Sequence, residues 1–573
     1  MELLELLLIL AGSLAVTAFA RWRSLPAPLL VVAVALCVSF IPGIPKIEID
    51  SQVILTVILP PLLYSASLDV SLQNFRQSLV QIRRLGIGLV IVTALVVGFV
   101  AYHLIPDMTL PAAILVGAIV APPDAVSAAA IGRKLGLPRK VMSVISGESL
   151  INDAASLTLV KVFLAIVGGA SLSLGHDLGI FALAIGVGVA VGLVLGVTVH
   201  FVRMRINDPV VEIVIGLLLP FIAYIVAEEL QGSGVLAVVS AGLYVGYNSP
   251  KSGYATRLQE RPIWAALDVT LEGFVFALIG LQLATVVADV SSSSRGLGQS
   301  VGVAFVVLGV VILTRPVFVF VTYYWSRGVR RIIHSRFRRF RRARTARLVW
   351  GRSDPKLDWR QLTVISWTGM RGVVTLAAAV SIPMVTEGHQ VPARDTMFLI
   401  AFVVTVGTLL LQGLTLPAVI RRLGVQDLGQ AERDVQAELR LVSNSTQQAV
   451  DYIDKRRDAW AEEWGAEPID RGITLLKERL QRQDVAFRQG LRDDADDEAV
   501  EQGEPDSSLA RPNRNNARAL ASIRRELLEK RREVVVRERD AGNLDEEVMR
   551  RVLLGLDAEE LAMDTSAVSR TRS

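Results

Sequence analysis

Residues 145–155 read ISGESLINDAA, which places two carboxylates and an amide inside an apolar segment. That segment runs over residues 141–170, long enough to cross the hydrocarbon layer of a bilayer as a helix. Charge in the middle of a membrane is costly and is kept mainly where it handles ions or protons. The stretch therefore predicts a membrane transporter of cations or protons.

The composition agrees with a membrane protein. The chain has 573 residues, of which 52% are hydrophobic, and they gather in blocks of roughly 20 residues, the length of a membrane span. Its only cysteine, Cys37, excludes a disulfide framework within the chain and a cysteine-based metal site. Glu2 and Glu5 precede the first basic residue, so we interpret the N-terminus as a spanning helix and not as a signal peptide.

The apolar blocks predict an all-α polytopic membrane protein with about thirteen transmembrane helices. The expected spans are 3–20, 25–42, 52–69, 85–106, 109–131, 141–168, 176–202, 208–230, 232–248, 263–289, 299–326, 361–386 and 396–420.

The loops after odd-numbered spans carry most of the Lys and Arg residues, as cytoplasmic loops do. Even-numbered loops carry only Lys46, Arg295 and Arg394. This alternation predicts a multi-pass protein of the cell membrane with an outside N-terminus and a cytoplasmic C-terminus. We interpret the Arg-rich block at 336–347 as a topology signal that contacts anionic lipid, so the expected partner is the bilayer and not nucleic acid.

The composition changes near residue 424, and the remaining chain is highly charged. We therefore predict a transmembrane domain over 1–423 and a cytosolic helical tail over 424–573, with a regulatory or oligomerising role and a ligand left open. Helices are expected over 434–464, 470–492, 517–540 and 544–563. The acidic stretch 493–516 is rich in Pro, Ser and Asn and predicts a disordered linker.

The charged residues of the sixth span predict an ion site. Asp153 lies near the midplane, and Ser149, four residues earlier, shares its helix face. Glu148 and Asn152 share an adjoining face. Hard monovalent cations prefer oxygen ligands, and burial also favours protonation of a carboxylate, so Asp153 could exchange a proton for a cation. The alternative is a structural ion pair, which is less expected for Asp153 than for Glu148.

The fifth span contains Pro122, Pro123 and Asp124 in succession. Two prolines break the helical hydrogen-bond ladder, and broken backbone inside a membrane is tolerated where it lines a cavity. The freed carbonyls over 121–123, including that of Pro123, are therefore candidate cation ligands, and Asp124 starts the following half-helix. A proline kink with Asp124 as a helix cap is the structural alternative.

The twelfth span places Arg371 at mid-membrane between Gly369 and Gly372. A buried Arg needs a counter-ion, and Glu148 at similar depth is the expected partner. This structural pair would leave Asp153 free. The fifth and twelfth spans, both interrupted, would correspond in two inverted six-helix repeats, a pattern typical of transporter sites.

Asp268 and Glu272, four residues apart near the start of the tenth span, are expected to line a funnel or to pair with a loop Arg. The sequence shows no phosphate-binding loop, no Ser–His–Asp arrangement and no zinc-ligand spacing. We therefore expect no enzyme activity and no cofactor.

Four motifs together resemble the sodium–proton exchanger family of monovalent cation–proton antiporters. They are PPDAV at 122–126, GESLIND at 147–153, SGVLAVVSAGL at 233–243 and GMRGVV at 369–374. The match covers roughly residues 1–423. The resemblance implies a homodimer, a six-helix core that moves as an elevator against a dimerisation domain, and electroneutral exchange associated with the Asn152–Asp153 pair.

The resemblance also implies roles for individual residues. Asp153 would carry the ion and the proton with Asn152 beside it, Ser149 and the carbonyl of Pro123 would be further ligands, and Glu148 and Arg371 would form a structural pair. Many members have an acidic residue in the third span where this chain has Ser65, which supplies a hydroxyl instead.

These patterns predict an antiporter that exchanges Na⁺ for H⁺, with Li⁺ and K⁺ as further candidate cations, by competition at Asp153. A K⁺-preferring antiporter is the first alternative. An ion channel gated by the tail and a membrane sensor that has lost transport are alternatives of another class.

Overall fold

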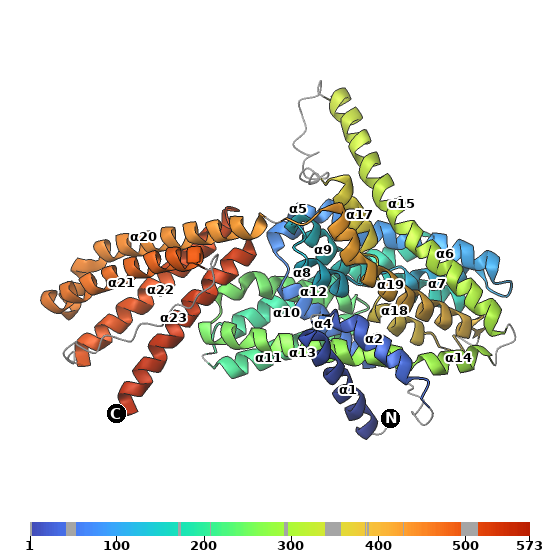
Figure 1. The fold of residues 1–573 in the computed structure, drawn as a ribbon, viewed down its shortest axis with the longest axis horizontal. Coiled ribbons are helices and arrows are strands. Elements are labelled where there is room, and N and C mark those ends of the chain that lie inside the picture. The colour runs from blue at the N-terminus through green and yellow to red at the C-terminus, as the bar shows by residue number, and fades with distance from the viewer. Residues whose placement is uncertain are drawn as a thin grey trace. The chain divides into compact units, whose positions relative to one another are not determined.

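The computed structural model describes residues 3–572 except 24, 42–52, 170–173, 207, 292–295, 338–356, 384, 387–388, 428 and 494–513. The chain divides into two compact units (Figure 1). The first comprises Met1–Asn248 and Arg261–Asp427, and the second comprises Ser249–Glu260 and Leu428–Ser573.

The first unit is built from helices with one short hairpin. Its helices are α1 (Leu3–Trp22), α2 (Ala27–Val38), η1 (Ile54–Ile58), α4 (Leu59–Leu68), α5 (Leu72–Arg83), η2 (Arg84–Leu89), α6 (Val90–Leu104), α7 (Leu110–Val120), α8 (Ala125–Lys134), α9 (Arg139–Val167), α10 (Leu174–Arg203), α11 (Pro209–Glu229), α12 (Gly234–Asn248), most of α13 (Tyr254–Leu281), α14 (Leu283–Ser291), α15 (Leu297–Phe337), α17 (Trp359–Trp367), α18 (Val373–Val380) and α19 (Arg394–Leu423). Strands β1 (Val385–Thr386) and β2 (His389–Gln390) pair antiparallel.

Eight helices among the described residues are long and apolar enough to cross a membrane. Three shorter apolar helices, over Ala27–Val38, Ile54–Leu68 and Leu110–Val120, add to them. An all-helical membrane protein is therefore confirmed, whereas the count of thirteen spans and the two inverted repeats stay predictions. The stretch 70–84, expected as a loop, is helical from Leu72 onward: Ser71 caps α5, which continues through η2 into α6.

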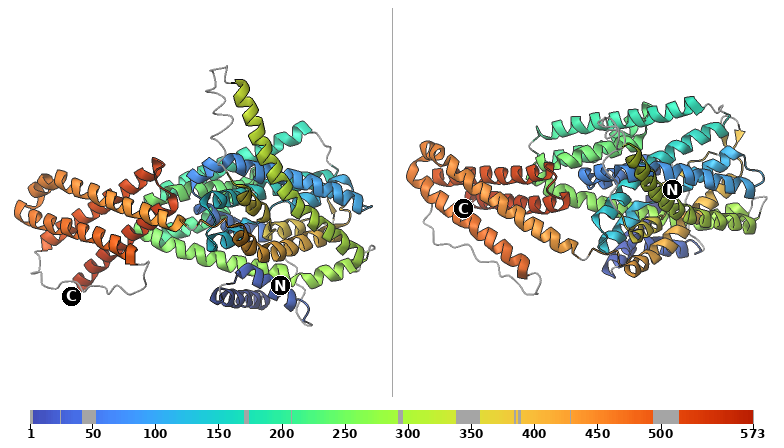
Figure 2. Two further views of the ribbon diagram at one scale, coloured as in Figure 1. Left: turned by 45° about the horizontal axis from the view of Figure 1, so that its top comes forward. Right: turned by 90° about the horizontal axis from the view of Figure 1, so that it is seen from above.

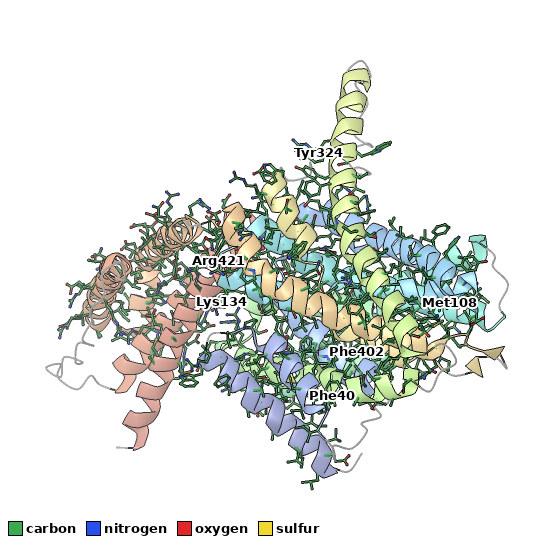
Figure 3. All side chains as sticks on the ribbon, turned by 45° about the vertical axis from the view of Figure 1, so that its right-hand side comes forward. Phe40, Met108, Lys134, Tyr324, Phe402 and Arg421 are labelled. Atoms are coloured by element: carbon green, nitrogen blue, oxygen red, sulfur yellow. The ribbon has the colours of Figure 1, made fainter. Side chains whose placement is uncertain are left out.

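The surface of α15 suits a lipid environment. Leu313, Val317 and Val321 follow one another at four-residue spacing and are 67%, 62% and 56% exposed. Exposed apolar residues also lie on α10 and α11. In Figure 3, Tyr324 of α15 points outwards, while Phe402 of α19 lies in the core. An exposed apolar stripe of this kind is typical of a surface that contacts a membrane or another protein.

Both expected interruptions are present. α7 ends at Val120 and α8 begins at Ala125, with Pro122 and Pro123 between them. The two prolines cannot donate a hydrogen bond, so the α7 ladder stops there. Likewise α17 ends at Trp367 and α18 begins at Val373. Figure 2 shows the helices of the first unit in two further views.

Close packing fixes the position of α7. A Cβ atom at Gly117 would lie 2.1 Å from the carbonyl oxygen of Ala94 on α6, so only glycine permits this approach. The large core of the first unit combines residues from α6, α7, α9, α15, α18 and α19, including Leu115, Val116 and Ile400. The interrupted helices are thus held on several sides by packed apolar side chains.

The second unit contains α20 (Gln430–Trp464), α21 (Ala466–Asp493), α22 (Arg514–Asp540) and α23 (Glu546–Arg572), in line with the helices expected there. Its core includes Ile453, Trp460, Ile473, Ile523 and Leu527. The expected linker lies outside the described residues except at its two ends.

Candidate ion-binding site

The two helix interruptions meet at Asp124. The backbone N–H of Asp124 donates to the carbonyl oxygen of Met370 over 2.6 Å, which joins the break after α7 to the break after α17. A Cβ atom at Gly372 would lie 2.7 Å from Cβ of Asp124. The meeting of the two breaks therefore requires glycine at position 372.

Arg371 covers the open end of α7. Its Nε donates to the carbonyl of Val120 over 3.0 Å and its Nη2 to that of Ala121 over 3.4 Å, while Nη1 bonds to the carbonyl of Gly369. The backbone N–H of Arg371 donates to Oγ1 of Thr408 over 2.9 Å. A cation at a helix C-terminus is favourable because the last carbonyls are unpaired and partly negative.

The expected pair of Glu148 with Arg371 is wrong. Both carboxylate oxygens of Glu148 accept hydrogen bonds from Arg315 of α15, over 2.5 Å and 2.8 Å. Nε of Arg315 also donates to the carbonyl of Ile365, over 3.0 Å. Glu148 faces the guanidinium fork of Arg315, whereas the hydrogen bonds of Arg371 all go to backbone and hydroxyl groups at the break. The depth in the membrane estimated from the sequence did not show which of the two arginines, Arg315 or Arg371, pairs with Glu148.

The middle of α9 is attached to the same break. Nδ2 of Asn152 donates to the carbonyl of Pro123 over 2.7 Å, and Oγ of Ser156 donates to that of Ala118 over 2.8 Å. The side chain of Asn152 is fully buried, and its Oδ1 has no hydrogen-bond partner among the described residues. α9 thus leaves one amide oxygen available at the break.

Asp153 is the adjacent residue and is 7% exposed. In the described part of the chain, no group donates a hydrogen bond to its carboxylate or forms an ion pair with it, and the charge of Asp124 acts on it. Asp124 accepts a hydrogen bond from Ser127 over 2.8 Å. Ser149, one helical turn before Asp153, is partly buried. The structure therefore brings Asp153, Asn152, Asp124 and Pro123 to one region.

A second polar group lies on α13. Oγ of Ser65 donates to Oδ2 of Asp268 over 2.5 Å, and the buried Oδ1 of Asp268 has no hydrogen-bond partner among the described residues. Glu272, one turn further, lines a cavity of about 40 Å³ together with Thr17 and Arg21. Asp268 and Asp124 both act electrostatically on Glu272. Glu272 is thus within electrostatic range of both Asp268 and Asp124.

The donor set fits a hard cation better than a transition metal. No group of three His, Cys, Asp or Glu side chains that could hold a metal ion occurs among the described residues. The groups at the break are two carboxylates, an amide oxygen and backbone carbonyls, and oxygen ligands of this kind suit hard cations. A buried carboxylate without a partner can be neutralised either by a proton or by such a cation.

Interrupted helices that meet around a buried carboxylate define the class of protein as a membrane carrier of ions. The family model "Sodium/hydrogen exchanger, transmembrane" matches residues 6–422, and the chain belongs to this family, which is one of transporters. Membership confirms the resemblance carried by the four sequence motifs.

Individual relatives agree with the family. An uncharacterised Na⁺/H⁺ exchanger of Mycobacterium tuberculosis is 31% identical over 548 residues, which cover 95% of this chain and 92% of that protein. The Na⁺/H⁺ antiporter ApNhaP of Aphanothece halophytica is 29% identical and covers 74% of this chain and 75% of its own. The similarity to the mycobacterial protein includes the tail.

The fold also resembles a solved structure. The sodium proton antiporter MjNhaP1 of Methanocaldococcus jannaschii superposes with a TM-score of 0.55 at 18% identity, over 73% of this chain and 97% of that one. At this identity the likeness concerns the fold alone.

Proposed function

We propose that this protein is a secondary antiporter that exchanges Na⁺ for H⁺ at Asp153. The observation that carries the proposal is a buried carboxylate that no described residue neutralises, next to a break in two helices. Relatives named as Na⁺/H⁺ antiporters support the choice of ions.

Competition between the two ions follows from the chemistry of Asp153. A charged, empty carboxylate is costly to move through an apolar region, whereas a protonated or cation-bound carboxylate is neutral. The loaded forms therefore move and the empty form does not. This requirement couples the inward movement of one ion to the outward movement of the other.

The neighbouring residues have distinct roles in the proposal. The carbonyl of Pro123 already accepts from Asn152, but a carbonyl oxygen has a second lone pair that can face a cation. Ser149 supplies a hydroxyl on the face of Asp153, and Oδ1 of Asn152 is a further acceptor. Asp124 adds negative charge that attracts the cation.

Asp268 and Glu272 lie on the approach to Asp153 in this proposal. Their carboxylates and the hydroxyl of Ser65 concentrate cations before the break is reached. The electrostatic interaction of Glu272 with Asp124 supports the continuity of this route.

The finer features are proposals as well. We infer a homodimer, an elevator movement of a six-helix core, a position in the cell membrane and a cytoplasmic tail over 424–573. Li⁺ and K⁺ are candidate alternative cations, and a K⁺-preferring antiporter would use the same residues. A channel gated by the tail or a sensor without transport would not need competition at Asp153.

The experiment is proton flux across proteoliposomes that contain the full chain and hold an outward proton gradient, challenged separately with Na⁺, Li⁺ and K⁺. An antiporter gives cation-dependent proton movement that saturates with cation concentration and ranks the three ions. Cation flux that continues without proton movement would favour a channel. Folded protein that responds to none of the three would contradict the proposal.

A further inference from the structure

The start of α13 belongs to the second compact unit. Residues Ser249–Glu260 group with the tail helices, whereas α13 from Arg261 onward groups with the first unit. The boundary falls beside Pro262, which removes one hydrogen bond from the interior of α13. α13 therefore continues as one helix across the boundary between the two units.

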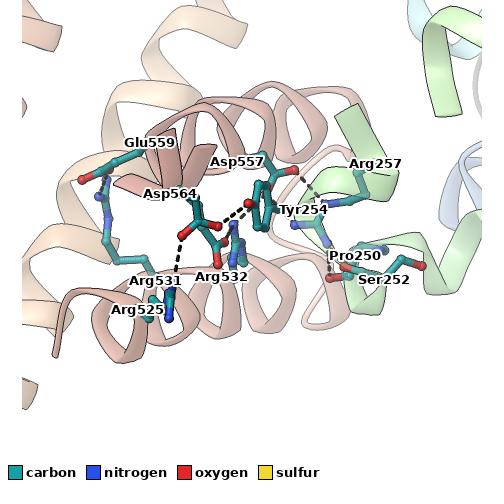
Figure 4. A network of polar contacts seen from close by, with 11 residues as sticks. Pro250, Ser252, Tyr254, Arg257, Arg525, Arg531, Arg532, Asp557, Glu559 and Asp564 are labelled. Atoms are coloured by element: carbon teal, nitrogen blue, oxygen red, sulfur yellow. Dashed lines mark hydrogen bonds and ion pairs between the residues drawn. The ribbon is translucent and has the colours of Figure 1, made fainter. Parts of the chain in front are cut away.

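Asp557 of α23 binds the first turn of α13 (Figure 4). Its two oxygens accept from Nε of Arg257 over 2.8 Å and from Nη2 over 2.5 Å, the bidentate geometry of a strong ion pair. Arg532 of α22 donates to the same carboxylate over 2.8 Å. The side chain of Asp557 is only 2% exposed, so water and salt screen these contacts weakly.

Arg257 also holds the turn that precedes α13. Its Nη1 donates to the carbonyl of Pro250 over 3.1 Å and to that of Ser252. Its guanidinium thus connects the turn, the helix and α23 at once. Loss of Arg257 would release all three connections.

A second contact lies two turns further along α23. Asp564 accepts a hydrogen bond from the hydroxyl of Tyr254 and another from Nη2 of Arg525, the latter over 2.7 Å. Two points of attachment, at Arg257 and at Tyr254, fix both the position and the direction of the first turn of α13 (Figure 4).

The same helix carries a residue of the proposed cation route. Asp268 follows Arg257 by eleven residues, which is about three helical turns and roughly 16 Å, so both side chains project from nearly the same face. Asp268 accepts from Ser65 over 2.5 Å. The first turn of α13 and Asp268 are thus parts of one continuous helix.

We propose that the attachment of α23 to the first turn of α13, hereafter the α23 tether, orders α13 and keeps Asp268 positioned for cations. The state of the tail would in this way tune the cation affinity of exchange. The inference rests on the proposed Na⁺/H⁺ antiport. Tyr254, Arg257, Asp557 and Asp564 are positioning residues and contact no transported ion.

The test uses the full chain in proteoliposomes and compares Arg257→Gln, Asp557→Asn and the double variant with wild type. We expect each single change to raise the half-saturating Na⁺ concentration about five-fold or more, the lower end of typical coupling between sites. The double variant should show no further rise, because both changes release the same tether. Hydrogen exchange over 254–268 should increase in parallel.

Arg456→Gln is the matched control. It breaks an ion pair with Glu526 between two tail helices without touching α13. It should leave the half-saturating Na⁺ concentration unchanged. Folded Arg257→Gln and Asp557→Asn proteins could instead show faster hydrogen exchange with an unchanged or lowered half-saturating Na⁺ concentration. This result would contradict the proposal and leave the contact with a structural role alone.

Asp557→Asn leaves two arginines without their buried carboxylate and could prevent folding. Tyr254→Phe then decides the question, since it removes only the hydroxyl that donates to Asp564. A smaller rise in half-saturating Na⁺ supports the tether, and no rise contradicts it. Failure of the antiport proposal is distinct, because wild type itself would then show no Na⁺-dependent proton flux.

Discussion

Glu148 and Arg315 form a bidentate ion pair across 167 residues of sequence, with side chains 2% and 1% exposed. The pair neutralises the Glu148 carboxylate on α9. Asp153, further along α9, has no such partner in the described part of the chain. The structural role proposed for Glu148 and the ion-binding role proposed for Asp153 follow from this difference.

Glu148→Gln should destabilise the protein by about 3 kcal/mol, because it leaves a buried arginine charge without its counter-charge. Thermal unfolding of the purified protein measures the loss. The double variant Glu148→Leu with Arg315→Met should recover most of it, since apolar residues can replace a buried pair.

Lys161→Gln is the control for this series, because Lys161 is 61% exposed in its pair with Glu228 and should contribute under about 1 kcal/mol. A Glu148→Gln protein as stable as wild type, with weaker cation affinity, would instead place Glu148 in the ion site.

Gly372→Ala should abolish exchange, because the added Cβ would lie within 2.7–3.0 Å of three Asp124 side-chain atoms and push the two helix breaks apart. Gly309→Ala on α15 is the matched control. Its Cβ would meet no atom within 4 Å, so exchange should persist and the helix should gain up to about 1 kcal/mol. Equal activity of both variants in the flux assay would show that the breaks tolerate separation.

Ser65→Ala should raise the half-saturating Na⁺ concentration about two- to ten-fold, the range given by the loss of one hydrogen bond to Asp268. Ser67→Ala removes a hydroxyl that bonds only within its own helix, to the carbonyl of Leu63, and should leave the value unchanged. Identical kinetics of the two variants would remove Asp268 from the cation route.

Acidification to pH 5 should leave the α23 tether intact. The hydrogen bond from Tyr254, followed by that from Arg525, holds the pKa of Asp564 below its usual range. A lowered carboxylate pKa in the folded state contributes stability that is complete above the ordinary value of about 3.9 and is lost only as pH falls through the lower folded value. Hydrogen exchange over 254–257, corrected for its intrinsic pH dependence, should therefore match at pH 7 and pH 5. Release of this segment at pH 5 would contradict the assignment.

The interruptions could be predicted from sequence because their causes are local. Two adjacent prolines must end α7, and the glycines at 369 and 372 weaken the twelfth span. The expected depth of Asp153 near the midplane likewise comes only from its distance along the helix. These inferences need only the periodicity and length of a helix.

The partners of the charged residues could not be predicted in the same way. Depth made Arg371 and Glu148 appear matched, but Arg315 comes from a different helix whose rotation the sequence does not define. The Ser65–Asp268 contact likewise joins residues 203 positions apart. Residues 70–84 were expected as a loop because their charges obscured the amphipathic pattern of α5.

The most direct test of the account is Na⁺-dependent proton flux in proteoliposomes with Asp153→Asn beside wild type, both shown to be folded by thermal unfolding. Exchange at Asp153 gives saturable flux in wild type and none in the variant, because asparagine takes up no proton at neutral pH and has no negative charge to neutralise Na⁺. Wild-type flux in folded Asp153→Asn would contradict exchange at Asp153.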